Sequence, residues 1–195
     1  MIFERGHFQS KKINESRIKD SLNETKMFSS RSAYSSKPTV FLSHKHDDLD
    51  DARGVIGELE SIGAKVYIDS MDNKMPEQTS GETAKRIKDV IKFCNKFILL
   101  ATDKAIESYW CNWELGIGDT YKYIDHIAIL PIKEKGTYDH NFKGNEYLQI
   151  YPRIDYNKAF TNIHGHYFKE GYYVKQPADK TGTVYITELS EWLKK

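Results

Sequence analysis

The segment from Ser108 to Leu115 has the residue types and the spacing of a chemical site. It reads Ser-Tyr-Trp-Cys-Asn-Trp-Glu-Leu, and its serine is a typical first residue before a helix. Trp110 and Glu114 are four residues apart, so on a helix they share one face, close to the preceding loop. An aromatic ring beside a carboxylate suits a substrate with a flat cationic or aromatic ring and a ribose. The same pattern also fits two core tryptophans with a solvated glutamate.

Strands and helices alternate along residues 37–132 and must position this segment. Apolar strands are predicted over 39–43, 65–69, 96–102 and 126–132. Helices are predicted after Asp47 or Asp48, after a capping box of Thr79 with Glu82, and from Ser108 to about Tyr121. The strands are continuous apolar runs, as in a parallel sheet that helices cover on both faces. The pattern therefore predicts an α/β fold with a doubly wound parallel sheet of about five strands.

Both ends of the chain are predicted as additions to a central domain that spans residues 37–160. Residues 1–36 form a polar N-terminal arm that we expect to be flexible, although Ile13, Ile18 and Leu22 are spaced as in a short helix. A fifth strand is expected over 147–151. Residues 161–195 are a C-terminal extension packed on the domain, with a hairpin over 166–175 around Glu170 and Gly171, and a terminal helix over 183–194.

Composition excludes several classes of function. The chain has 195 residues, 29 basic and 28 acidic, so its net charge of +1 gives no electrostatic basis for binding nucleic acid. The apolar runs are far shorter than the roughly 20 residues of a membrane helix, and the N-terminus lacks the pattern of a secretion signal. The two cysteines lack CxxC spacing, and no cysteine or carboxylate cluster lies near His164 and His166 to complete a metal site. We therefore expect a cytoplasmic protein that binds no membrane, nucleic acid or metal.

Loops that follow the strands are where an open parallel sheet binds its ligand. None of these loops carries the glycine patterns of a Rossmann domain, a P-loop NTPase or an α/β-hydrolase. Ser43, His44 and Lys45 follow the first strand instead, and Asp69 ends the second.

Several segments together resemble a Toll/interleukin-1 receptor (TIR) domain. They are Val40–His44, Val66–Asp69, Phe97–Ala101 and Ser108–Leu115, of which the Trp-Cys-x-x-Glu piece is the most specific. The resemblance covers roughly residues 38–160 and implies the flavodoxin-like TIR fold. Catalytic TIR domains cleave the nicotinamide–ribose bond of NAD+, and their catalytic glutamate occupies the position of Glu114. The resemblance therefore implies NAD+ as the substrate and Glu114 as the catalytic residue.

The implied reaction assigns roles to the other pocket residues. The nicotinamide ring of NAD+ is already cationic before it leaves, so the reaction needs no metal or cofactor, and one carboxylate can stabilise the oxocarbenium-like transition state. Trp110 would stack on a ring of the substrate and exclude water. The remaining substrate-binding residues are predicted to be Ser43, His44, Lys45 and Asp69, with Lys45 facing the diphosphate and Asp69 anchoring the loop over 70–78.

Some bacterial TIR proteins act in Thoeris-type anti-phage defence. They produce cyclic ADP-ribose isomers that activate a separate effector protein. The resemblance therefore implies a signal that is ADP-ribose or a cyclic isomer of it, a low basal rate, and TIR–TIR self-association through the loop over 70–78. The alternative is a non-catalytic adaptor that acts by homotypic contacts, although adaptor-type TIR domains commonly lack the glutamate. A phosphoacceptor receiver, with Asp103 and Lys133, is disfavoured because no acidic pair follows the first strand.

Overall fold

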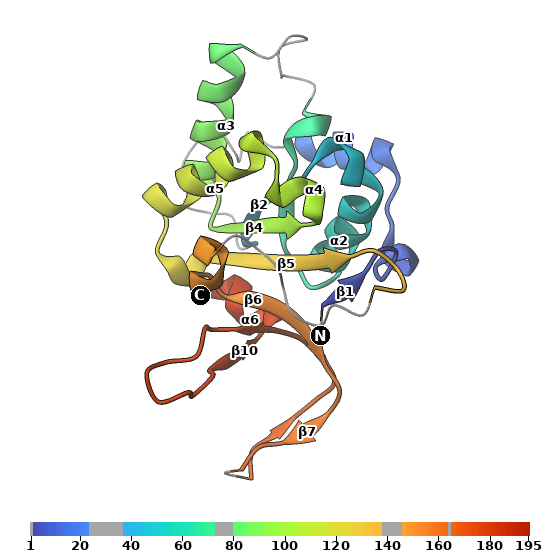
Figure 1. Cartoon of the computed structure of the whole chain (residues 1–195). Helices are drawn as coiled ribbons and strands as arrows, with labels where there is room; N and C mark the ends of the chain where they lie inside the picture. Colours follow the sequence, from blue (N-terminus) through green and yellow to red (C-terminus); the bar gives the residue numbers. More distant parts are fainter. Residues whose placement is uncertain (1, 24–36, 73–79, 138–145, 164) are drawn as a thin grey trace.

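Five parallel strands form the centre of the structure, a computed structural model that describes residues 2–23, 37–72, 80–137, 146–163 and 165–195. These strands are β2 (Thr39–Ser43), β3 (Lys65–Tyr67), β4 (Lys96–Ala101), β5 (Ile127–Lys133) and β6 (Arg153–Asn157). Their order is β3-β2-β4-β5-β6, and every neighbouring pair is parallel. Helices lie on both faces of this sheet (Figure 1). The predicted doubly wound, flavodoxin-like fold is confirmed.

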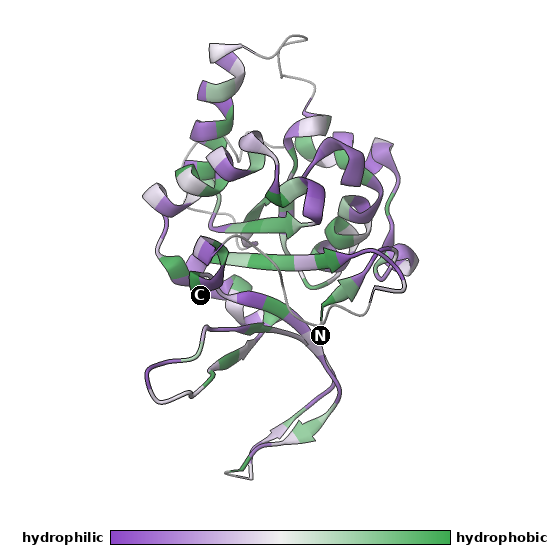
Figure 2. Ribbon diagram, viewed as in Figure 1, coloured by the Kyte–Doolittle hydropathy of each residue, from purple (hydrophilic) through white to green (hydrophobic). Residues whose placement is uncertain are grey.

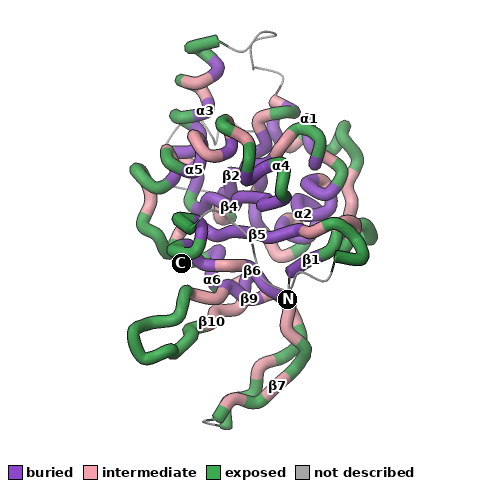
Figure 3. Tube along the Cα trace, viewed as in Figure 1, coloured by how far each residue is buried: buried purple, intermediate pink, exposed green. Residues whose placement is uncertain are grey.

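The core lies along β2, β4 and β5, whose residues are almost all buried. Figure 2 shows these strands as mostly hydrophobic, and Figure 3 shows them as the most continuously buried part of the chain. Phe41 stacks on Phe97 across β2 and β4, with ring centroids 5.5 Å apart and an interplanar angle of 7°. A strand buried on both faces needs apolar side chains on both, and this is why the sequence pattern is continuous rather than alternating.

In the described part of the chain, four helices connect these parallel strands. They are α2 (Leu49–Ser61), α3 (Gly81–Phe93), α4 (Asp103–Ile106) and α5 (Tyr109–Tyr121). Ser108 caps α5 as predicted, because its side chain accepts a hydrogen bond from the amide of Cys111. The capping box of α3 is formed by Ser80 and Thr83, rather than by the predicted pair of Thr79 and Glu82. Thr79 itself lies outside the described residues.

Residues 2–23 pack against the domain, so the expectation of a flexible arm is wrong over this part. β1 (Phe3–Glu4) pairs in parallel with the end of β5, and Phe3, Phe8 and Ile18 are buried. The short 3-10 helix η1 (Gln9–Lys11) follows, and then α1 (Glu15–Asn23), the helix that the apolar spacing predicts. The polar composition was misleading because a few apolar side chains are enough to anchor the segment. Residues 24–36 lie outside the described part of the chain.

Arg5 fixes this segment to the edge of the sheet where the parallel strands end. Its guanidinium contacts the carboxylates of Asp48 at 2.7 Å and Asp51 at 2.8 Å, and it also contacts Glu134. Asp48 stands directly before α2, in the 3-10 helix η3 (His46–Asp48). Its side chain makes no capping hydrogen bond to α2, although the sequence predicts the helix to start after Asp47 or Asp48. The carboxylate of Asp48 instead accepts hydrogen bonds from Arg5 and from Thr102, which joins the loops after β2 and β4.

Two glycines of α2 allow η1 to approach the helix closely. A Cβ atom at Gly57 would lie 1.8 Å from the backbone oxygen of Lys11, and one at Gly54 would lie 2.6 Å from the oxygen of Phe8. We expect Gly57→Ala to lower the free energy of unfolding by about 1–2 kcal/mol, because the backbone of η1 must move away. Urea denaturation measures this change.

Gly116→Ala is the matched control for that prediction. Gly116 lies in α5, and a Cβ atom there would meet nothing within 4 Å. Alanine has the higher helix propensity, so Gly116→Ala should leave stability unchanged or raise it by about 0.5–1 kcal/mol. Equal stability of the Gly57→Ala variant and the unchanged protein would show that η1 does not pack on α2 as described.

The chain after β5 follows a different path from the predicted one. Residues 146–150 form the 3-10 helix η6 (Glu146–Ile150) rather than a strand, and only Leu148 of this helix is buried. The fifth strand is β6, which begins just after Pro152. The expected hairpin over 166–175 is also wrong. β8 (Tyr167–Phe168) pairs with β7 (Phe160–Thr161), whereas β9 (Gly171–Lys175) pairs antiparallel with β6.

The last residues extend the sheet and then cover its edge. β10 (Ile186–Glu188) pairs antiparallel with β9, so only Leu189–Lys194 (α6) of the predicted terminal helix is helical. Trp192 of α6 is buried, and its indole N–H donates a hydrogen bond of 2.6 Å to the carbonyl of Asp125. Asp125 belongs to the 3-10 helix η5 (Ile124–His126), which leads into β5. The helix that the apolar stripe predicts is therefore shorter than expected but packs on the domain.

Candidate active site

The candidate site lies where β2 ends and α5 begins. Ser43 is the last residue of β2, and Glu114 lies in the second turn of α5. The hydroxyl of Ser43 donates a hydrogen bond of 2.5 Å to Oε2 of Glu114. The two residues are 71 positions apart in sequence, and both are almost completely buried, with Glu114 only 1% exposed. The parallel topology brings them together, because the carboxyl end of β2 faces the start of α5.

The pKa of Glu114 is raised well above its ordinary value. Burial is the main cause, since removing a carboxylate from water disfavours its charged form, and the negative charge of Asp69 adds to the rise. Ser43 and the side chain of Trp110 act in the opposite direction. The second oxygen of Glu114, Oε1, is buried and has no well-formed hydrogen bond within the described residues. The closed site therefore favours a neutral carboxyl group at Glu114.

His44 joins the end of β2 to the end of β3. Its Nε2 lies 3.0 Å from Oγ of Ser70, and its Nδ1 lies 3.8 Å from Oδ1 of Asp69. The imidazole is buried, and burial lowers its pKa, although the negative charges of Asp69 and Asp48 oppose this effect. His44 is thus placed to position Asp69 and Ser70, both in the 3-10 helix η4 (Asp69–Met71).

A second group of polar contacts holds the far end of η4. The hydroxyl of Tyr67 donates a hydrogen bond of 2.7 Å to Asp72, and Arg86 of α3 forms an ion pair of 2.6 Å with the same carboxylate. The predicted strand over 65–69 therefore ends earlier, at Tyr67, and Asp69 begins the turn that follows. Of the loop predicted to mediate self-association, residues 73–79 lie outside the described part of the chain.

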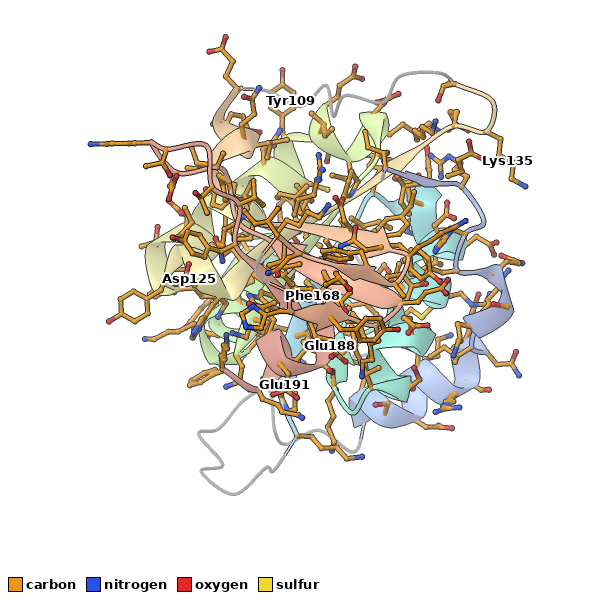
Figure 4. The ribbon with its side chains drawn as sticks, turned by 90° about the horizontal axis from the view of Figure 1, so that it is seen from below. Tyr109, Asp125, Lys135, Phe168, Glu188 and Glu191 are labelled. Atoms are coloured by element: carbon orange, nitrogen blue, oxygen red, sulfur yellow. The ribbon has the colours of Figure 1, made fainter. Side chains whose placement is uncertain are left out.

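Trp110 lies on the same face of α5 as Glu114, as the four-residue spacing predicts. It is half-buried and packs on Trp113, with ring centroids 5.1 Å apart. Tyr109, one residue earlier, is 94% exposed and lies at the periphery of the molecule in Figure 4. The Trp110 ring therefore already packs against another tryptophan. Its role in stacking on a substrate stays a prediction.

The structure brings Ser43, His44, Asp69, Trp110 and Glu114 into one neighbourhood. Lys45 comes next to it along the chain and is half-buried. Among the described residues, no hydrogen bond or ion pair joins Lys45 to Glu114 or Asp69. The proposed contact of Lys45 with a diphosphate therefore stays a prediction.

Sequence reasoning missed two residues at this site. Ser70 contacts His44, and its position directly after Asp69 is the one signal that pointed to it. The second is Cys111, which is buried and lies beside Ser43 and Ser108. Burial raises the pKa of the Cys111 thiol to about 11, and the nearby Glu114 contributes to this rise. The thiol therefore stays protonated at neutral pH.

Neither a membrane-spanning helix nor a cluster of metal ligands is present in the described ranges. No helix there is long and apolar enough to cross a bilayer. In the same ranges, no three side chains of His, Cys, Asp or Glu are grouped as metal ligands would be. His164 lies outside them.

Comparison with known proteins agrees with the fold. A stretch of 117 residues is 32% identical to a protein of Bacillus cereus (strain MSX-D12) named as a probable 3' cyclic ADP-D-ribose synthase, ThsB'. This stretch is 59% of each chain, so the present chain spans less than two thirds of the length of that relative. A model of the TIR domain matches residues 40–163, more than half of the chain. The protein is therefore a member of the TIR domain family, and not a receiver domain.

Proposed function

We propose that this protein consumes NAD+ by cleaving the bond between nicotinamide and ribose. The product is ADP-ribose or a cyclic isomer of it, which serves in anti-phage defence as a signal to a separate effector protein. The observation that carries this proposal is the buried carboxyl group of Glu114, held by Ser43 at the end of β2. The similarity to a protein named as a cyclic ADP-D-ribose synthase supports the class of product.

The reaction uses the negative charge of Glu114. As the C–N bond breaks, its electron pair leaves with nicotinamide, which becomes neutral, and positive charge develops on the ribose. A carboxylate beneath the ribose stabilises that charge, and its oxygens can accept hydrogen bonds from the ribose hydroxyls. Attack of water on the anomeric carbon gives ADP-ribose and a proton. Attack by a nucleophilic group of the same molecule gives a cyclic isomer, which exclusion of water favours.

The closed geometry supports a low resting rate. Glu114 is 1% exposed and its surroundings favour the neutral form, so a substrate must open the site and ionise the carboxyl group. The cationic nicotinamide ring favours ionisation when it arrives, because an opposite charge nearby lowers the pKa of a carboxyl group. We expect activation to accompany self-association of TIR domains, and the effector to recognise the nucleotide product rather than this protein.

The test of this proposal measures the nucleotides that form in cell lysates. The protein is incubated with NAD+ in lysates of phage-infected and uninfected cells, and mass spectrometry follows NAD+, ADP-ribose and its cyclic isomers. Loss of NAD+ with a new ADP-ribose species supports the proposal. Absence of any product in both lysates would favour the alternative, a non-catalytic adaptor. The comparisons give no support to that alternative.

The pH dependence of kcat/KM tests the electrostatics of the site. Because the charge of Asp69 raises the pKa of Glu114, Asp69→Asn should lower that pKa. If catalysis needs the carboxylate, kcat/KM rises as the pH increases through the pKa of Glu114, and this rise should move to lower pH in the variant. Asp89→Asn, an exposed change on α3, is the control. A rise at the same pH in Asp69→Asn and the unchanged protein would contradict the proposed coupling.

A further inference from the structure

A groove of about 1260 Å³ lies on the C-terminal part of the sheet, away from Glu114. Its floor comes from β6, β9 and β10, and none of the candidate active-site residues lines it. Two segments that project from the domain in Figure 1 contribute lining residues, the hairpin of β7 with β8 and the connection from β9 to β10. Figure 4 views the molecule from this side, with Phe168 and Glu188 labelled over the C-terminal strands.

The charged side chains that line the groove are all cations. They are Arg153, Lys158 and Lys175. Asp155 lies beneath them, fully buried, and accepts contacts from Arg153 at 2.9 Å and from Lys175 at 3.0 Å. One buried carboxylate thus offsets two of the three cations only in part, and the groove keeps an excess of positive charge. Such a surface is complementary to an acidic ligand.

The flanks of the groove carry exposed apolar side chains. Tyr185 is 61% exposed and Val184 is 48% exposed on one projection, and Ile163 and Tyr167 are exposed on the other. Of the ten exposed large hydrophobic residues in the described part of the chain, six lie between residues 147 and 185. Gathered apolar side chains of this kind, rich in tyrosine, are typical of surfaces that bind proteins. Figure 3 shows both projections as mainly exposed or half-buried.

The size of the groove favours a protein segment over a single small molecule. Pockets for small ligands usually have volumes of about 300–1000 Å³ and enclose most of the ligand. This groove is larger, and residues of both projections line it. One of these projections, the connection from β9 to β10, lies entirely beyond residue 163, where the match to the TIR family ends.

We propose that this groove binds an extended segment of a partner protein in which acidic side chains are combined with apolar ones. The acidic groups meet Lys158, Lys175 and Arg153, and the apolar groups pack on Tyr185 and Val184. The proposal does not depend on NAD+ cleavage, since it concerns a separate surface.

Selection from a random peptide library displayed on ribosomes tests this proposal. It does not require the identity of the partner protein. Peptides selected on the unchanged protein should be enriched in combined acidic and apolar residues. The dissociation constants of the enriched peptides should rise about tenfold in the double variant Lys158→Glu with Lys175→Gln. They should also rise about tenfold in a separate single variant, Tyr185→Ser. Arg153 remains in the double variant to pair with Asp155, which protects the fold, and thermal unfolding checks this.

Two variants of the same chemistry outside the groove are the controls. Lys85→Glu changes an exposed lysine of α3, and Tyr123→Ser changes a tyrosine that is 82% exposed before η5. Both should bind the enriched peptides as the unchanged protein does. The proposal is overturned if no peptide is enriched, if the enriched peptides lack acidic residues, or if the groove variants bind them unchanged. It is also overturned if light scattering shows that the groove variants split a dimer, because the occupant is then a second copy.

Discussion

Replacing Glu114 by glutamine is expected to reduce NAD+ cleavage by about 10²–10³-fold in kcat/KM. Glutamine has nearly the size of glutamate and can still accept the hydrogen bond from Ser43. It cannot carry the negative charge that stabilises an oxocarbenium-like transition state. The proposed mechanism makes this charge the main contribution of the protein to the chemical step.

The same substitution should leave the fold intact. Glu114 is buried, and its environment already favours a neutral group, so a neutral amide adds no buried charge. Thermal unfolding of Glu114→Gln should match that of the unchanged protein, or occur at a higher temperature. A loss of activity together with a retained melting temperature therefore reports on catalysis and not on folding.

Glu107→Gln is the matched control, because Glu107 is an exposed glutamate between α4 and α5. It makes the same chemical change near the start of α5 and should cleave NAD+ at the unchanged rate. Mass spectrometry of the nicotinamide released measures the rate of NAD+ cleavage by the unchanged protein and by the two variants. If Glu114→Gln kept the full rate, Glu114 would not be the catalytic carboxylate, and the site would have to be sought elsewhere.

Local patterns were sufficient for the part of the chain that carries Glu114. The cap at Ser108, the four-residue spacing of Trp110 and Glu114, and the buried strand ending at Ser43 are each encoded within a few residues. Parallel strands place their carboxyl ends at one edge, so the proximity of Ser43, Asp69 and Glu114 also followed from topology. The burial of Glu114 did not, because it depends on contacts with residues far away in the sequence, such as Ser43 and Asp69.

Elements fixed by distant partners escaped sequence reasoning. β9 pairs with β6, whose residues are 14 or more positions earlier, and nothing local in 166–175 distinguishes this pairing from the expected hairpin. The segment over 147–151 is mostly apolar and aromatic, yet residues 146–150 form η6, in which only Leu148 is buried. The N-terminal segment is polar overall, but Phe3, Phe8 and Ile18 find places in a core that other elements build. Long-range contacts therefore determine the structure of all three segments.

The ion pairs of Arg5 lead to the second large expected effect, on stability. Arg5→Gln should lower the free energy of unfolding by about 2–3 kcal/mol, because it leaves the carboxylate of Asp48 buried without a cation. Asp48 has no exposed side-chain surface, and Asp51 has 10%. Urea denaturation measures the loss, and hydrogen exchange of residues 2–23 should become faster as β1 is released from β5.

Arg17→Gln makes the same change at an exposed pair and is the control. Arg17 is 66% exposed and pairs with Glu60 at 3.2 Å, so its loss should cost little, about 0–1 kcal/mol. The double variant Arg5→Gln with Asp48→Asn separates charge from packing. If the loss comes from the unpaired charge at Asp48, removing that charge should restore part of the stability, since Thr102 can still donate a hydrogen bond to an amide oxygen. A double variant less stable than Arg5→Gln alone would show that the carboxylate of Asp48 is held by other contacts, and that Arg5 acts by packing.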